Sequence, residues 1–267
     1  MLGEKSAFRE LHHRVGAFVI PNPWDVGSAK ILAALGFEAL ATTSAGFAFS
    51  QGLKDGAVTP EAMIDHCRDI VRATPLPVSA DLEKGFGDAP KAVAETIVRA
   101  AATGLAGCSI EDFSGDQSRP IFPFDLAVER IAAAVEAAAA LDHDFVLTAR
   151  AENFLRGNPD LDDTIRRLQA FEAAGADVLY APGLRDLGQI RTVCAAVSKP
   201  VNVIMGLPGV ALDVAQLAAA GVKRISVGSA LARLAYGGLI GAGKEMQTGT
   251  FGFADGAAGF AEIQRLL

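Results

Sequence analysis

Residues Val78 to Gly87 read VSADLEKGFG, the pattern of a buried β-strand that ends in two carboxylates and a glycine-rich turn. Successive side chains of a strand point to opposite faces, so Asp81 and Glu83 are expected to point the same way. Two like charges held at one strand end repel each other, and a bound cation commonly relieves that repulsion. The stretch therefore predicts a strand that ends at a metal site.

Two later segments also end in acids. Residues Ser109 to Asp112 read SIED, and residues Thr148 to Glu152 read TARAE, so the second of them carries Arg150 as well. Solvated loop carboxylates could account for any one of these segments, but three successive strands that end in acids favour a common site. Carboxylate oxygens suit a hard metal ion, and an arginine suits an anionic substrate.

The composition limits the class of protein. The 267 residues are 51% hydrophobic, enough for one large barrel or two modest domains. No apolar run approaches the roughly 20 residues that span a membrane, and Met1 to Ser6 lack the basic and apolar regions of a signal peptide. Three widely spaced cysteines argue against a disulfide framework, so we expect a cytoplasmic protein. A net charge of −7 argues against nucleic acid as a partner.

Eight short, continuously apolar segments alternate with alanine-rich amphipathic segments. Continuous hydrophobicity indicates strands that are covered on both faces, as in a parallel sheet. Gly36, Gly104, Gly175 and Gly221 stand where helices are expected to end. The expected strands are Ala17–Pro23, Ala39–Ser44, Pro77–Glu83, Gly107–Asp112, Phe145–Glu152, Asp177–Gly183, Val201–Met205 and Arg224–Ser229, and the clearest helices are Ala89–Ala102, Leu126–Leu141 and Leu161–Ala174.

Eight strand–helix units in about 235 residues predict an α/β fold of the (β/α)8 barrel class rather than a doubly wound open sheet. We expect one barrel domain over residues 1–235 and a C-terminal helical extension over residues 236–267. The active sites of such barrels lie at the C-terminal ends of the strands, and each acidic cluster described above falls there.

Six motifs in order resemble a known family. Residues 81–87, DLEKGFG, are similar to the Asp-x-Asp-x-Gly-[Phe/Tyr]-Gly strand end of the isocitrate lyase/phosphoenolpyruvate mutase superfamily. The segments IED at 110–112 and ARAE at 149–152 resemble its next two strand ends. With NPWD at 22–25, TSAG at 43–46 and GLKDG at 52–56, the resemblance runs from about Pro21 to Gly228.

The resemblance implies a barrel that binds Mg²⁺, or Mn²⁺ in its place, and positions a small 2-oxo or 2-hydroxy carboxylate while an enolate forms. It implies that Asp81 binds the metal directly and that Glu83 and Glu111 hold metal-bound waters. Mg²⁺ usually keeps several waters and takes one or two direct carboxylates, which agrees with this division. Asp55 would lie nearby, on the loop after the second strand.

The same resemblance implies how the substrate is held. The backbone of Ser44, Ala45 and Gly46 would receive the substrate carboxylate. Arg150 would bind the substrate and neutralise the oxyanion that develops on it. The catalytic residues predicted in this way are Arg150, Asp55 and Glu111.

The chain departs from the family pattern at two places that bear on the reaction. Glu83 replaces the usual aspartate, which a water-mediated contact would tolerate. The isocitrate and methylisocitrate lyases have a catalytic cysteine in a Lys-x-Cys-Gly loop, whereas residues 113–120 read FSGDQSRP here and contain none. Isocitrate lyase activity is therefore not expected. Gln117 and Ser118 offer polar substitutes for substrate contacts in that loop.

These features favour a Mg²⁺-dependent lyase that breaks a carbon–carbon bond of a small 2-oxo or 2-hydroxy carboxylate. Three alternatives stay open: a P–C bond enzyme such as a phosphonopyruvate mutase or hydrolase, an unrelated phosphate-binding barrel enzyme, and a non-catalytic carboxylate sensor. The four histidines fall away from the predicted strand ends, so a histidine base or a zinc site is not expected.

The C-terminal residues predict an oligomer. Phe260, Ile263, Leu266 and Leu267 recur at helical spacing and form an apolar stripe beyond the expected end of the barrel. Exposed apolar stripes commonly mark subunit contacts. The resembled family exchanges C-terminal helices between neighbouring barrels, which implies a homo-oligomer here, a tetramer built as a dimer of dimers.

Overall fold

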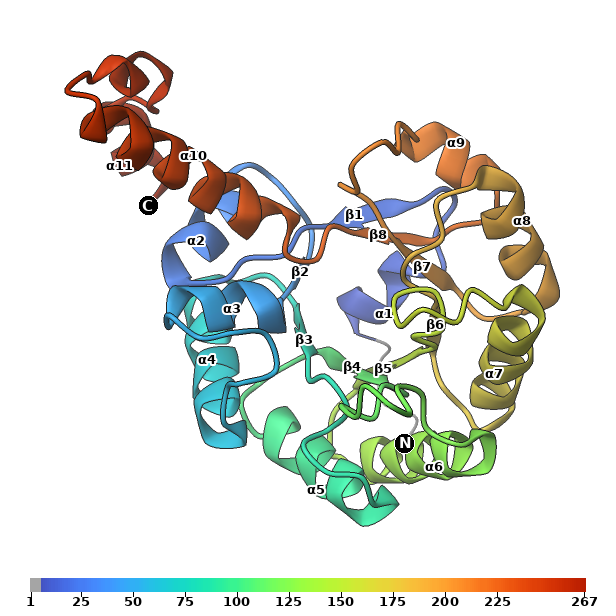
Figure 1. Cartoon of the computed structure of the whole chain (residues 1–267). Coiled ribbons are helices and arrows are strands. Elements are labelled where there is room, and N and C mark those ends of the chain that lie inside the picture. The colour runs from blue at the N-terminus through green and yellow to red at the C-terminus, as the bar shows by residue number, and fades with distance from the viewer. Residues whose placement is uncertain (1–5) are drawn as a thin grey trace.

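The computed structural model describes residues 6–267, and it confirms the predicted (β/α)8 barrel (Figure 1). Eight parallel strands pair in the order β1-β8-β7-β6-β5-β4-β3-β2. Between the two end strands, β1 and β2, the backbone N–H of Ala41 donates to the carbonyl of Pro21. The strands are β1 (Phe18–Ile20), β2 (Leu40–Ala41), β3 (Val78–Asp81), β4 (Gly107–Glu111), β5 (Val146–Arg150), β6 (Val178–Tyr180), β7 (Val201–Ile204) and β8 (Arg224–Ser226).

Each strand is shorter than the apolar segment that predicted it. The paired part is confined to the barrel wall, and the remaining residues turn into the loops that carry polar side chains. Seven helices surround the wall, and the glycines at positions 36, 104, 175 and 221 have positive φ just after four of these helices, as expected of helix ends. The ring helices are α2 (Val26–Ala34), α4 (Pro60–Ala73), α5 (Pro90–Ala101), α6 (Phe124–Ala139), α7 (Leu161–Ala173), α8 (Leu187–Ala196) and α9 (Val214–Ala219).

The interior of the barrel is apolar at one end and polar at the other. Phe8 of the short helix α1 (Ala7–Leu11) packs against Phe18, Val146 and Val178, so α1 plugs the N-terminal end. Farther along the strands the inward positions are small and polar, including Ser79, Ser109 and Thr148, where many barrels place bulky branched residues. Small side chains leave space inside the wall, and this space is continuous with the site described below.

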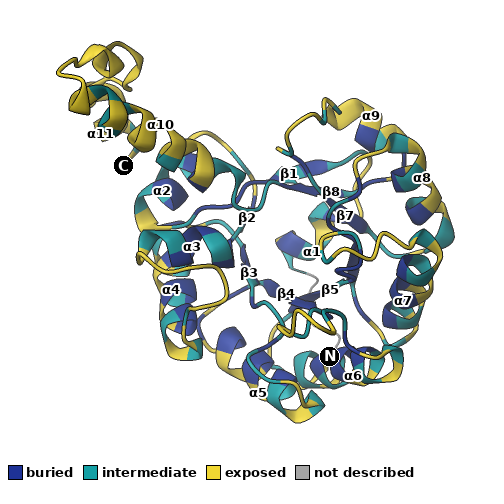
Figure 2. Ribbon diagram, viewed as in Figure 1, coloured by how far each residue is buried: buried dark blue, intermediate teal, exposed yellow. Residues whose placement is uncertain are grey.

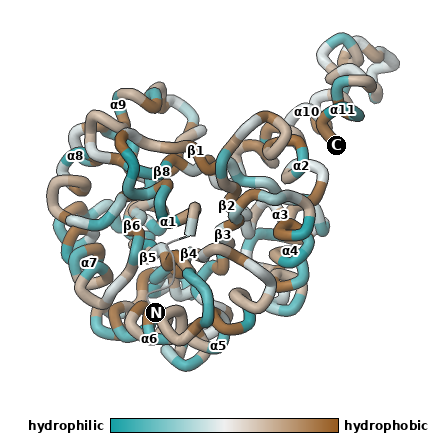
Figure 3. The backbone as a smooth tube through the Cα atoms, turned by 180° about the vertical axis from the view of Figure 1, so that it is seen from behind, coloured by the Kyte–Doolittle hydropathy of each residue, from teal (hydrophilic) through white to brown (hydrophobic). Residues whose placement is uncertain are grey.

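The helix that follows β8 does not join the ring. Helix α10 (Ala230–Gln247) projects away from the barrel and is followed by η1 (Gly252–Gly256) and α11 (Phe260–Leu266) (Figures 1 and 3). The eighth helix therefore leaves the barrel as part of an arm, residues 230–267. The predicted boundary at 235/236 falls inside α10.

The arm is largely unburied (Figure 2). Ala232 is its only buried residue, and Phe260 is 78% exposed, Leu234 73% and Phe251 65%. Apolar surface of this extent favours association with another surface. We therefore propose the arm as an extension that buries itself against other copies of the chain in a homotetramer.

Light scattering is expected to report a mass well above the 27.6 kDa of one chain. Deletion of the residues after Gly249, or replacement of Phe251 and Phe260 by serine, should lower that mass because it removes the apolar contact area. Val98, 53% exposed on the barrel helix α5, offers the matched control, and its replacement by serine should leave the mass unchanged. A wild-type monomer at micromolar concentration would contradict the proposal.

No helix among residues 6–267 combines the length and the apolar character needed to cross a membrane.

Candidate active site

The predicted acidic residues meet at one cavity of about 540 Å³ at the C-terminal ends of the strands. Asp81 ends β3 and Glu111 ends β4, while Asp55 reaches the rim from the loop after α3 (Ser44–Ser50). Parallel strands end on the same side of the barrel wall, which is why acids far apart in sequence gather here. The lining includes Ser44, Ala45, Asp55, Asp81, Glu83, Glu111, Gln117, Arg150, Arg156 and Arg224.

Arg150 lies at the centre of the acidic group. Its Nη1 is 2.8 Å from Asp81 Oδ1, and its Nη2 is 3.0 Å from Glu111 Oε2 and 2.7 Å from Glu152 Oε1. Burial alone would lower the pKa of Arg150, but the carboxylates of Glu111, Glu152 and Asp81 raise it well above its usual range. The guanidinium is therefore permanently cationic, and it brings three carboxylates together around itself.

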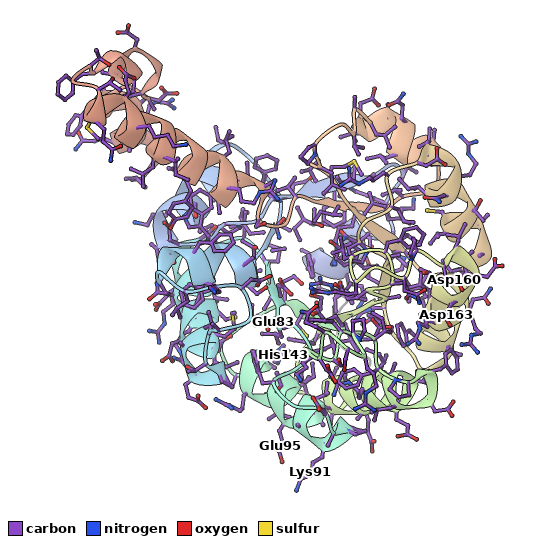
Figure 4. The ribbon with its side chains drawn as sticks, viewed as in Figure 1. Glu83, Lys91, Glu95, His143, Asp160 and Asp163 are labelled. Carbon is purple, nitrogen blue, oxygen red and sulfur yellow. The ribbon has the colours of Figure 1, made fainter. Side chains whose placement is uncertain are left out.

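Glu83 reaches the same cavity by a different backbone path from the one expected. Strand pairing ends at Asp81, and Glu83 has a left-handed φ of 50°, so a turn rather than strand alternation directs its side chain (Figure 4). Leu82 between them is fully buried in the core. Burial, and then the neighbouring Asp81 and Asp55, raise the pKa of Glu83 to about 7.

A buried arginine that the sequence analysis did not single out holds this turn in place. The guanidinium of Arg130, on α6, donates to the carbonyls of Lys84, Gly87 and Asp88, the last two at 2.6 and 2.5 Å. Backbone with positive φ at non-glycine positions is strained and persists where its surroundings over-determine it. Arg130 supplies that restraint for the loop that follows Glu83.

The chemistry of the lining suits a hard divalent cation. Asp55, Asp81, Glu83 and Glu111 offer only oxygen donors, and burial together with the nearby Asp81 and Asp55 raises the pKa of Glu83. Within residues 6–267 no group of three or more His, Cys, Asp or Glu side chains is arranged as a ready metal cluster. Oxygen donors of this kind suit Mg²⁺, which takes one or two direct carboxylates and keeps several waters.

The predicted carboxylate-binding segment is only partly available. The Ser44 N–H and hydroxyl both donate to Asp81 Oδ2, at 3.2 and 2.8 Å, and the Gly46 N–H donates to Thr43 Oγ1. Ser44 and Ala45 line the cavity, but Gly46 does not. A Cβ at Gly46 would lie 2.6 Å from Thr43 Cγ2, so this glycine serves close packing at the start of α3.

The loop of residues 114–121 forms a small turn at the cavity. Ser114 N–H donates to the Pro120 carbonyl, and Lys84 Nζ donates to the Ser114 carbonyl, so the loop is tied to the turn after β3. Gln117 lines the cavity, as expected. Ser118 does not, because its N–H and hydroxyl both donate to Asp116 Oδ1.

Residues 114–119 are mostly exposed and have few apolar anchors, so we predict that this loop moves when a ligand binds. Protease nicking within it should slow when Mg²⁺ and oxalate, an enolate mimic, are added together. Nicking in the exposed turn around Gly209 serves as the control and should not change. Equal rates of cleavage in the lid with and without ligand would count against a lid.

Two further charged residues join the network around Arg150. Glu152, the acid of the third predicted strand end, is fully buried and accepts from Arg150 Nε at 3.1 Å, and its own N–H donates to Asp112 Oδ1. Arg156 pairs with Glu152 from the loop beyond β5, and no pattern in the sequence marks it.

A closed barrel with acids and an arginine gathered where its strands end has the architecture of a barrel enzyme. The model of the phosphoenolpyruvate phosphomutase family matches residues 8–247. The chain belongs to that family, and hence to the isocitrate lyase/phosphoenolpyruvate mutase superfamily, as the motifs indicated. Its relatives are lyases and mutases.

Three relatives show the range of similarity. A solved structure from Burkholderia cenocepacia J2315, provisionally described as a lyase or mutase, is 59% identical, with a TM-score of 0.94 over 97% of this chain and 93% of that one. The oxaloacetate decarboxylase of Chromohalobacter salexigens is 30% identical over 85% of this chain and 79% of its own. A 2,3-dimethylmalate lyase structure is 27% identical, with a TM-score of 0.85 over 97% and 93%.

Proposed function

We propose that the chain is a Mg²⁺-dependent lyase, also served by Mn²⁺, that breaks a carbon–carbon bond of a small 2-oxo or 2-hydroxy carboxylate through an enolate. The observation that carries the proposal is the convergence of Asp81, Glu83 and Glu111 with Arg150 on one cavity. The similarity to an oxaloacetate decarboxylase and to a 2,3-dimethylmalate lyase supports it, because decarboxylation breaks a carbon–carbon bond.

In this proposal Asp81 holds the metal directly, and Glu83 and Glu111 hold its waters. The bound ion would supply positive charge beside the substrate oxygen. Bond cleavage leaves an electron pair on the substrate, and the Arg150 guanidinium, kept cationic by its neighbours, stabilises the resulting oxyanion. Ala45, whose N–H faces no acceptor within residues 6–267, offers the free backbone donor for the substrate carboxylate.

Product formation from a panel of substrates tests the proposal. Oxaloacetate, 2-methylisocitrate, 2,3-dimethylmalate and phosphonopyruvate would each be incubated with and without Mg²⁺, and 2-oxo acid products, together with phosphoenolpyruvate from phosphonopyruvate, would be measured. We expect Mg²⁺-dependent turnover of a substrate that breaks a carbon–carbon bond. Turnover of phosphonopyruvate alone would replace the proposal with a P–C bond enzyme, and ligand binding without turnover of any substrate would indicate a sensor.

A further inference from the structure

The two guanidinium groups beside the acids differ in how many of their donors are used. All three nitrogens of Arg150 contact protein carboxylates within 3.1 Å. Arg156 donates from Nε alone, to Glu152 Oε2 at 3.2 Å. Its Nη2 lies 3.8 Å from Glu111 Oε1, which is too long for a hydrogen bond. Within residues 6–267, both Nη groups of Arg156 are therefore available to another acceptor.

Arg156 is held so that these free donors have a defined direction. Its guanidinium lies 3.5 Å from the ring centroid of Phe113, at the start of the lid, and the Nε bond to Glu152 fixes the rotation of the plane. Its backbone N–H donates to the Glu152 carbonyl at 3.1 Å, which anchors the loop itself. A planar fork that is already ordered loses little entropy when it binds a carboxylate in a bidentate manner.

The position of Arg156 indicates which part of a ligand it meets. Its side chain is 28% exposed against 11% for Arg150, and it lines the cavity together with Gln117 and Leu155 at the mouth. Arg150 and Asp81 lie deeper, where the reacting part of the substrate would sit. A ligand that spans the cavity would therefore direct its far end toward Arg156.

We propose that Arg156 binds a second carboxylate of the substrate, so that this site selects dicarboxylates over monocarboxylates. The inference rests on the proposed function for the position of the first carboxylate. Racemic malate and racemic 2-hydroxybutyrate probe it, because they have the same carbon chain and differ by one carboxylate in place of a methyl group. Oxalate is too short to reach Arg156 at the mouth of the cavity, so its affinity measures binding to the deeper part of the site alone.

Titration calorimetry in the presence of Mg²⁺ would measure the three dissociation constants. We expect the wild-type protein to bind malate at least about 20-fold more tightly than 2-hydroxybutyrate, the scale of a charge-assisted bidentate contact. In Arg156→Met this ratio should fall below about 3, while the constants for oxalate and 2-hydroxybutyrate change less than about 3-fold. Arg156→Lys keeps the positive charge but not the planar guanidinium fork, so its ratio of the two dissociation constants should be at least about 5-fold lower than the wild-type ratio.

Arg166→Lys is the matched control. Like Arg156, Arg166 pairs with an acidic side chain, Asp163 at 2.7 Å, and stacks on a phenylalanine, Phe124 at 4.2 Å, but it does not line the cavity. Its variant should keep the wild-type ratio. An unchanged ratio in Arg156→Met, or an equal loss of all three ligands, would overturn the inference, the latter by showing that Arg156 only supports Glu152. Failure of the wild-type protein to bind oxalate with Mg²⁺ would instead refute the proposed function.

Discussion

Replacement of Asp81 by alanine is expected to lower Mg²⁺-dependent kcat/KM by at least about 1000-fold. The loss of a group that only holds a metal-bound water typically costs about 10- to 100-fold, and a direct ligand should cost more. Asp81 also receives the Ser44 N–H and hydroxyl and the Nη1 of Arg150, so its removal disturbs the segment that faces the substrate. Steady-state kinetics at saturating Mg²⁺ would measure the loss of kcat/KM, and titration with Mn²⁺ would measure the metal affinity.

Glu83→Gln provides the graded comparison, because Glu83 lines the same cavity without an ion pair among the described residues. It should lose about 10- to 100-fold. The Asp81→Ala protein should remain folded, since Arg150 keeps Glu111 and Glu152 as partners, and its free energy of unfolding should fall by about 1 to 2 kcal/mol. Metal affinity unchanged in Asp81→Ala would show that this carboxylate is not the direct ligand.

Arg150→Lys is expected to reduce kcat/KM by about 100-fold or more, the scale of one lost oxyanion donor. Lysine keeps the positive charge but not the planar fork that contacts Asp81, Glu111 and Glu152 at once. The charge matters for folding, because an uncharged replacement would leave the buried carboxylates of Glu111 and Glu152 without their cation, at a cost of about 3 to 5 kcal/mol.

Steady-state kinetics and thermal unfolding of Arg150→Lys would be measured side by side. A folded variant with wild-type kinetics would assign Arg150 a structural role. The Arg166→Lys variant again serves as the comparison, since Arg166 is exposed and does not line the cavity, so both measurements should stay unchanged.

The barrel and the gathering of its acids could be predicted from residue order alone. Continuous apolar segments such as Val178–Ala181 favour strands covered on both faces, as in a parallel sheet, and parallel strands carry their final residues to one edge. Asp81, Glu111 and Arg150 are such final residues, so their proximity follows from the period of the strands and from the fold class. Glu83 lines the same cavity, although a turn rather than the strand directs it there.

The remaining features depend on contacts between segments that no local pattern relates. A Cβ at Gly46 would lie 3.0 Å from Trp24 Cβ and 3.2 Å from Ala232 Cβ, and both of these residues are far from Gly46 in the sequence.

The sequence by itself determined the barrel, its acidic mouth and the apolar stripe beyond it, because periodicity and strand ends are local properties. Only the tertiary structure decided that Arg150 is bonded to three carboxylates, that Arg156 keeps free donors, and that α10 leaves the ring. The physical reason is that pairing among buried charges, and the direction in which a helix leaves a barrel, depend on distances between parts of the chain that are far apart in sequence.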